Sequence, residues 1–297
     1  MKLRNTAACG LIAVVGVWLV ASGCGGGGTG GRDIVIDEPV QLTRTFEEGQ
    51  TLKYKLKSMG EMAVAMQGFD RVANTQTEFR TTSVFSDTDS DEIKMAMRFD
   101  HAASSISVGD QVIPQESASA LRGKTLEVSL APNGQVLSFS GMGGEEYFEE
   151  GIGQMAMMIH GMFPILPEEP LTIGYTWQDD MDIPNITSAT TREFVGETTY
   201  TVVGFKEKYQ IPCVEVATVT TFEFEGKVEQ QGEAWLMTGA GEANGTVLFS
   251  VEDGLIIYST SDSTIDFEGE GSTTAGAAAS TTLSAGLKLR GTMELLD

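Results

Sequence analysis

The chain has few of the side chains that metal chemistry and nucleic-acid binding need. It contains three cysteines and two histidines in 297 residues. His101 and His160 are the only imidazoles, which excludes a zinc site with three histidines. Basic residues are also scarce, because 19 Lys and Arg stand against 42 Asp and Glu, a formal net charge of -23. We therefore expect no cofactor and no nucleic-acid partner, because so acidic a surface repels a polyanion.

Long apolar runs are absent except at the start of the chain, where Ala7–Ala21 follows Lys2 and Arg4. The run is too short to cross a hydrocarbon core comfortably, since about 20 apolar residues are needed for ~30 Å. Basic residues before a short apolar run are typical of a secretory signal peptide. The sequence therefore predicts that residues 1–23 are a signal peptide, removed from the mature protein.

The end of this leader, Val20-Ala21-Ser22-Gly23-Cys24, resembles the bacterial lipobox. Ala21 departs from it, because the pattern usually has leucine there. The resemblance implies a diacylglycerol on the Cys24 thiol, with further acyl chains such as palmitate, and hence a membrane anchor. It implies a bacterial envelope location, and Gly25 in place of aspartate favours the outer membrane. Residues 24–32 would then be the lipidated cysteine and a glycine-rich tether.

With Cys9 in the leader and Cys24 acylated, Cys213 is the one thiol left. We expect it to be a buried, inert side chain at the start of a strand.

Apolar and polar residues alternate along most of the remaining chain, as in strands with one buried and one wet face. Leu52, Tyr54 and Leu56 give the clearest example. The same period recurs in many later segments, and Asn133-Gly134 between apolar runs predicts a hairpin. We predict a mainly β fold over 33–297, a large curved antiparallel sheet or open half-barrel. A faint repeat suggests two similar halves, 33–142 and 168–297.

One segment has helical rather than strand periodicity. Apolar residues recur at three- and four-residue steps between Glu145 and Phe163, which predicts one central amphipathic helix at 145–163. Five side chains on its stripe are candidates for lining an apolar-ligand site: Phe148, Ile152, Met155, Ile159 and Met162. Methionine is favoured where a surface must repack around variable apolar partners, but such a stripe is also typical of ordinary core. The pattern alone leaves both interpretations open.

Three motifs, taken together, resemble a family of uncharacterised bacterial envelope lipoproteins, a domain of unknown function. They are Gly49–Tyr54, Pro167–Trp177 and the run from Gly196 to Cys213. The resemblance implies no activity. More loosely, the pattern is similar to the half-barrel lipoproteins that carry lipids or other lipoproteins, a likeness of fold that does not fix function.

Catalytic and metal motifs are weak. Asp100-His101 with Ser104 offers the residue types of a triad, but neighbouring residues in a strand point to opposite faces. We therefore expect no enzyme. Asp179-Asp180 is expected to be a pair of solvated loop charges.

A weak calcium candidate is the acidic stretch with Asp87, Asp89 and Asp91. It fails the EF-hand pattern, and a polar hairpin tip is the favoured interpretation.

The sequence therefore predicts a lipid-anchored envelope protein that binds lipid or another apolar ligand in a half-barrel. The alternative hypothesis is a structural or protein-interaction component of the envelope without a small-molecule ligand.

Overall fold

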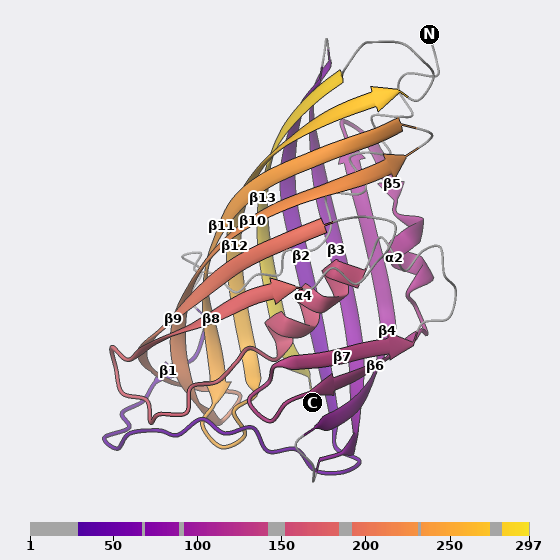
Figure 1. The fold of residues 1–297 in the computed structure, drawn as a ribbon. Helices are drawn as coiled ribbons and strands as arrows, with labels where there is room; N and C mark the ends of the chain where they lie inside the picture. Colours follow the sequence, from indigo (N-terminus) through magenta and orange to yellow (C-terminus); the bar gives the residue numbers. More distant parts are fainter. Residues whose placement is uncertain are drawn as a thin grey trace.

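The fold was taken from a computed structural model, which describes residues 29–66, 69–88, 92–141, 152–183, 192–230, 233–273 and 281–296. Its dominant feature is one antiparallel sheet of 13 strands in the order β1-β9-β10-β11-β12-β13-β2-β3-β4-β6-β7, with β5 paired to β4 and β8 paired to β9. The sheet is curled but not closed (Figure 1). The mainly β fold class is confirmed.

Most of the strands are long, and the described residues include two short helices, α2 and α4. The elements are β1 Arg32–Asp33, β2 Thr51–Met66, β3 Phe69–Asp87, β4 Ile93–Val108, β5 Gln111–Pro114, α2 Glu116–Ala120, β6 Thr125–Leu130, β7 Val136–Gly141, α4 Ile152–Met162, β8 Thr176–Ile183, β9 Arg192–Lys208, β10 Ile211–Gln230, β11 Glu233–Ser250, β12 Ile256–Thr273 and β13 Thr281–Leu296.

Alternation explains the strands that the sequence predicts. In β2, Leu52, Tyr54 and Leu56 are buried, while the lysines between them are exposed or partly exposed. The structure extends the same strand to Met66. We call the face with the buried side chains the inner face and the opposite one the outer face.

Two strands lack the alternation of apolar and polar residues, for different physical reasons. The inner face of β3 carries buried threonine and serine, including Thr75, Thr77 and Ser83, so its period is not apolar. The inner positions of β11 include Gly239 and Gly241, and the rings of Phe224 and Phe222 occupy the space where a Cβ would lie. In both strands the neighbours supply the packing, which hydropathy alone does not reveal.

The N-terminal and C-terminal parts of the chain share this sheet, because β13 pairs with β2 from Leu283↔Met66 to Leu296↔Lys53. The predicted segments 33–142 and 168–297 therefore contribute strands to a single sheet. Their proposed similarity stays a prediction.

The sheet has an open seam between β7 and the β8 side of β9. The helix α4 lies in this gap and contacts both β7 and β8 (Figure 1). The predicted helix at 145–163 is confirmed over Ile152–Met162; residues 142–151 lie outside the described residues. Among the described residues no strand joins the two edges there, and α4 contacts both of them.

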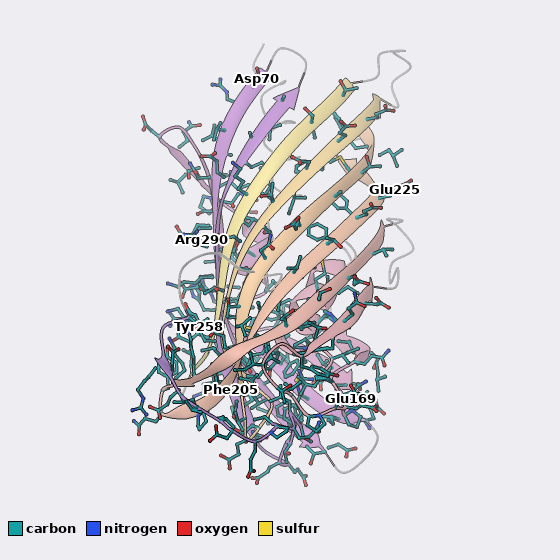
Figure 2. The ribbon with its side chains drawn as sticks, turned by 90° about the vertical axis from the view of Figure 1, so that its left-hand side faces the viewer. Asp70, Glu169, Phe205, Glu225, Tyr258 and Arg290 are labelled. Carbon is teal, nitrogen blue, oxygen red and sulfur yellow. The ribbon has the colours of Figure 1, made fainter. Side chains whose placement is uncertain are left out.

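The inner face carries the core, in two main clusters. The larger one lies beneath α4 and includes Phe46, which stacks on Phe85 with ring centroids 4.1 Å apart and meets the ring of Phe163 edge-on. The smaller one lines the farther parts of β2, β3, β4 and β10–β13 and includes Trp235, Met237 and Phe267. In Figure 2, Asp70 and Glu225 mark the far end of the strands, and Phe205 and Glu169 mark the α4 end.

Candidate functional site

The helix α4 presents apolar side chains to the interior. Met158, Ile159 and Met162 are 3%, 0% and 1% exposed and belong to the larger core cluster. Of the five predicted lining residues, Ile159 and Met162 thus pack in the core. Ile152 and Met155 lie in α4, but their side chains, like Phe148 as a whole, fall outside the described residues.

The opposite side of α4 makes a polar contact with β8. His160 Nε2 lies 3.3 Å from Asp179 Oδ2, and the same carboxylate oxygen accepts a hydrogen bond from the Ile165 amide at 3.0 Å. The Asp179 side chain is fully buried and that of His160 is 15% exposed. The expectation that Asp179 is a solvated loop charge is wrong, because β8 is a strand and Asp179 faces inward from it.

A buried arginine completes this cluster. Arg44, from the segment before β2, donates from Nη1 to Asn133 O at 2.9 Å and from Nη2 to Pro164 O at 2.5 Å. It therefore joins the chain just after α4 to the β6–β7 turn. Gly134 in that turn has φ 100°, and a Cβ there would overlap the guanidinium. The predicted Asn133-Gly134 turn is confirmed, and it has this additional role.

Burial dominates the protonation of these groups. Burial lowers the pKa of His160 below its ordinary value; Asp179 opposes this shift and Arg44 adds to it. Burial also raises the pKa of Asp179, against the effects of His160 and the Ile165 amide. The pKa of Arg44 falls to about 10, so the guanidinium stays charged at neutral pH. Burial therefore opposes the charged form of both His160 and Asp179.

Three buried polar atoms of the cluster have no hydrogen-bond partner within the described residues. They are Arg44 Nε, His160 Nε2 and Asp179 Oδ1. An unsatisfied buried polar group costs about 1–3 kcal/mol. The contact between α4 and β8 is therefore held by imperfect polar pairing, in contrast to the continuous strand ladders elsewhere.

Trp177 lies beside this contact. Its ring stacks on Tyr200 with centroids 4.8 Å apart, and its Nε1 donates to Ile165 O at 3.1 Å. Trp177 thus contacts the segment that leads from α4 to β8.

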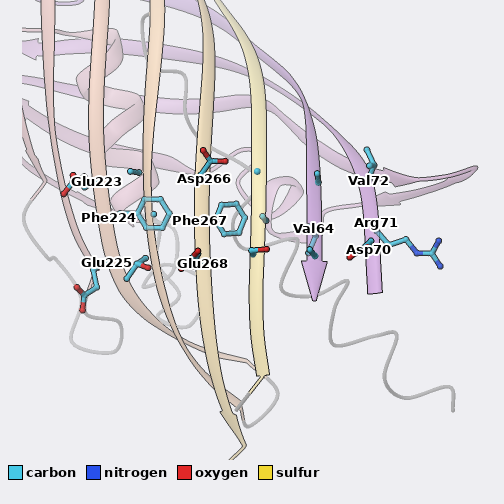
Figure 3. Close-up of a pocket in the computed structure, with 18 of the residues that line it drawn as sticks. Val64, Asp70, Arg71, Val72, Glu223, Phe224, Glu225, Asp266, Phe267 and Glu268 are labelled. Carbon is cyan, nitrogen blue, oxygen red and sulfur yellow. The ribbon is translucent and has the colours of Figure 1, made fainter. Parts of the chain in front are cut away.

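A second candidate site is a groove of about 1160 Å³ that spans β9, β10–β13, β2 and β3. Its lining combines exposed residues with residues of the inner face: Val64, Phe224, Gly239, Phe267 and Ala285. One complete row of cross-strand partners on the solvent-facing side lines it: Val195, Glu223, Ala240, Asp266, Gly286, Ala63 and Val72. Figure 3 shows the acidic side chains on β10 and β12.

The groove combines small and acidic residues. Ala63, Ala65, Ser284 and Gly286 lie along β2 and β13, where they leave room above the backbone. Five acidic residues and one basic residue are among its lining: Asp70, Glu223, Glu225, Asp266, Glu268 and Arg71. Among the described residues, no group of three or more Asp, Glu, His or Cys is arranged to hold a metal ion.

The residues of the possible triad have other partners. The Asp100 carboxylate accepts hydrogen bonds from Arg98 Nε at 2.8 Å and from the Thr82 hydroxyl. The Ser104 hydroxyl lies 2.9 Å from Thr77 Oγ1.

Asp87 ends β3 and lies 3.7 Å from Lys94 Nζ, whereas Asp89 and Asp91 fall outside the described residues.

Cys213 is buried and unpaired, as predicted, and burial raises the pKa of its thiol to about 11. Cys24 and the leader lie outside the described residues. Within the part of the chain that the structure describes, no helix is both long and apolar enough to cross a membrane.

No family model matches the chain, and no curated protein matches it. The family resemblance drawn from the three sequence motifs therefore stays a prediction.

Among solved structures, the chain is similar to OccK5 (OpdH) of Pseudomonas aeruginosa, with 4% identity and a TM-score of 0.25 over 83% of this chain and 98% of that one. It is also similar to the outer membrane protein OprD of Pseudomonas aeruginosa, with 6% identity and a TM-score of 0.21 over 88% and 98% of the two chains. A DUF1329 family protein from Desulfovibrio piger shows 9% identity and a TM-score of 0.13 over 79% and 83%. Likeness at these scores is weak and assigns no function.

Proposed function

We propose that this chain is a lipid-anchored envelope protein that binds an apolar ligand with an acyl chain on the inner face of its curled sheet. In this proposal, α4 is a plug that the ligand displaces, and no catalytic step is involved. The observation that carries it is the seam. Its edges, β7 and β8, are bridged by α4, which presents Met158, Ile159 and Met162 to an apolar interior.

The free energy gained by burying the inward side chains of α4 is comparable to that gained by burying an acyl chain. Burial of one large apolar side chain contributes about 1.5–3 kcal/mol, so the three inward residues of α4 contribute about 5–9 kcal/mol. An acyl chain of about 16 carbons can gain about 0.8 kcal/mol for each buried CH₂, or roughly 12 kcal/mol in all. A ligand of that size can therefore replace the plug.

The composition of α4 supports the same role. Gly153 and Gly161 lie within the helix, and each glycine lowers helix stability by up to ~1 kcal/mol relative to alanine. The helix therefore depends on its contacts with the sheet. Methionine adapts to partners of different shape, so Met158 and Met162 suit a surface that repacks.

Photolabelling tests this function. The Cys24→Ser chain, which keeps every described residue, is mixed with palmitate carrying a diazirine at the middle of its chain and is irradiated. Adducts are mapped by mass spectrometry, with unlabelled palmitate as competitor. We expect saturable adducts on inner-face residues such as Met62 and Met158, and none on Met59, which is 57% exposed on the outer face of β2.

The absence of competable adducts would contradict the proposal, and so would adducts confined to the outer face. Because Met59 and Met62 lie on the same strand, they give a matched pair of positions with the same side chain and opposite orientation.

The groove over β9–β13, β2 and β3 favours a second candidate function, the docking of a basic protein partner. Its acidic residues and its small side chains would admit an extended segment that carries lysine or arginine. This is the protein-interaction alternative.

The test is the binding of a fluorescent decalysine peptide at two salt concentrations. Glu223→Gln with Asp266→Asn should weaken binding severalfold. Glu242→Gln, a carboxylate that is exposed on β11 but not among the groove residues, should not. Equal effects of these variants would show only a non-specific response to the acidic surface.

A further inference from the structure

We propose that the end of the sheet with the β9–β10 turn faces a phospholipid bilayer, because the chain that follows the lipid attachment point is bound to that end. The helix α4 then lies on the bilayer side of the molecule. This orientation rests on the lipid anchor of the proposed function. The attachment of residues 29–34 to the sheet belongs to the folded chain itself and can be measured without the lipid.

The first described residue, Thr29, is held by two strands. It is 2% exposed, and its carbonyl oxygen accepts a hydrogen bond from Lys208 Nζ at 2.7 Å. Its hydroxyl donates to Glu215 Oε1 on β10 at 3.2 Å, and Lys206 Nζ lies 2.9 Å from the same carboxylate oxygen. Both the backbone and the side chain of Thr29 are therefore bound to the ends of β9 and β10.

The residues that follow Thr29 continue along the edge of β9. In β1, Arg32 lies opposite Glu207, and its guanidinium is 3.0 Å from the Glu207 carboxylate (Figure 1). The Ile34 amide then donates to Phe205 O at 3.1 Å. At Gly31 the two backbones are so close that a Cβ would lie 3.0 Å from Glu207 O. The chain from Thr29 to Ile34 is thus in register with the end of β9.

This attachment lies at the end of the molecule that also carries α4. The two-residue turn Tyr209-Gln210 joins β9 to β10, and the Val251 amide in the β11–β12 turn donates to Pro212 O at 2.9 Å. Both turns are therefore at one end of the sheet. In Figure 2, Phe205 lies at that end, and Glu225 lies at the far end.

Chain length sets how far this end can lie from the membrane. Cys24 is five residues before Thr29, and a fully extended chain of that length spans at most about 18 Å. By contrast, the part of β10 from Pro212 to Glu225 is roughly 44 Å long at about 3.4 Å per residue. The anchor therefore keeps the turn end near the bilayer, and an acyl chain that leaves the bilayer meets α4 before it reaches the far end.

Energy transfer from the protein to the bilayer surface tests the orientation. The acylated full chain is added to phosphatidylcholine vesicles that contain acceptor-labelled lipid, and a donor is attached to one introduced cysteine. Glu252→Cys places the donor in the β11–β12 turn and Glu225→Cys places it at the far end; both glutamates are exposed, whereas Cys213 is buried. We expect at least about threefold more transfer from position 252, because of the length of strand between the two positions.

A release variant, Thr29→Ala with Lys208→Met, tests whether the attachment sets the orientation. It removes the hydroxyl and the ammonium group that hold residue 29, and methionine keeps an apolar stem at position 208. In the Cys24→Ser chain, amide exchange of residues 29–34 should rise at least about threefold, and in the acylated chain the transfer ratio should fall. The matched control is Lys94→Met, whose ammonium group lies 3.7 Å from Asp87 and which should change neither value.

Equal transfer from the two positions overturns the orientation, because it means that the sheet lies flat on the bilayer or tumbles above it. Exchange or transfer that the release variant leaves unchanged overturns the role of the attachment. If that variant does not fold, judged by its circular dichroism, Thr29→Ala alone serves in its place under the same criteria. Greater transfer from position 252 without competable photolabelling would support the orientation and contradict the ligand function. Photolabelling with equal transfer would do the reverse.

Discussion

Gly134 gives the most quantitative test of how the seam region is built. It lies in the β6–β7 turn with φ 100°. The atoms nearest to the position that a Cβ would occupy belong to Arg44 and the Phe163 carbonyl. In Gly134→Ala, the added methyl group would overlap Arg44 Nη1 and lie 2.9 Å from Phe163 O. The guanidinium would have to move away from the carbonyls that it binds.

The expected loss of stability is the sum of two effects. A non-glycine residue at positive φ costs about 1–2 kcal/mol. Displacement of Arg44 weakens two buried charged hydrogen bonds, each worth about 1.5–3 kcal/mol. We therefore expect Gly134→Ala to lower the free energy of unfolding by about 4 kcal/mol or more, a large part of the ~5–15 kcal/mol typical of native proteins.

Gly49→Ala is the matched control, because Gly49 also has positive φ, at 81°, with nothing within 4 Å of its Cβ position. It should lose only about 1–2 kcal/mol in urea unfolding analysed with a common slope. A Gly134→Ala loss no larger than that of Gly49→Ala would refute the reasoning. An Arg44→Met background should reduce the difference between the two glycine variants, as expected for coupled sites.

Three further predictions concern single groups. Tyr54→Phe should lower the free energy of unfolding by about 1 kcal/mol, because the buried hydroxyl donates to Ile256 O at 3.0 Å; an unchanged urea midpoint would contradict this. In a Cys9→Ser/Cys24→Ser chain, Cys213, with a pKa of about 11, should react with a disulfide reagent at pH 8 more than roughly a hundredfold more slowly than in urea, and equal rates would show an accessible thiolate. Cys24→Ser, or globomycin treatment, should alter the processing of the leader and the membrane fractionation of the protein, and unchanged processing and fractionation would refute lipidation.

Much of the fold could be predicted from local patterns. The strands around Leu52–Leu56 and Leu126–Leu130 follow from alternation, and α4 follows from its three- and four-residue steps. These elements bury one apolar side and expose the other, which is the condition under which hydropathy is informative. By contrast, β3 was not predicted, because its buried inner face includes Thr77 and Ser83.

The candidate site was less predictable, because its residues are distant in sequence. Arg44, His160 and Asp179 belong to three separate segments that only the curled sheet brings together. The doublet Asp179-Asp180 was interpreted as solvated because nothing local shows which carboxylate faces the core. A strand assignment for Thr176–Ile183 would have placed the two on opposite faces and indicated one buried acid.

The groove over β9–β13, β2 and β3 is not predicted from the sequence either. Its acidic residues alternate along β10 and β12, a pattern that is typical of the solvent-facing side of ordinary strands. The groove forms only where these strands lie side by side, which depends on the pairing of the whole sheet.

The most direct test of the central claim is the amide exchange of residues 157–163 in the Cys24→Ser chain, with and without saturating palmitate at pH 7.5. If an acyl chain displaces α4 from the seam, exchange of these amides should rise at least tenfold while the amides of β2 stay protected. Unchanged or slower exchange at α4, with palmitate demonstrably bound, would contradict the claim that the helix is a displaceable plug.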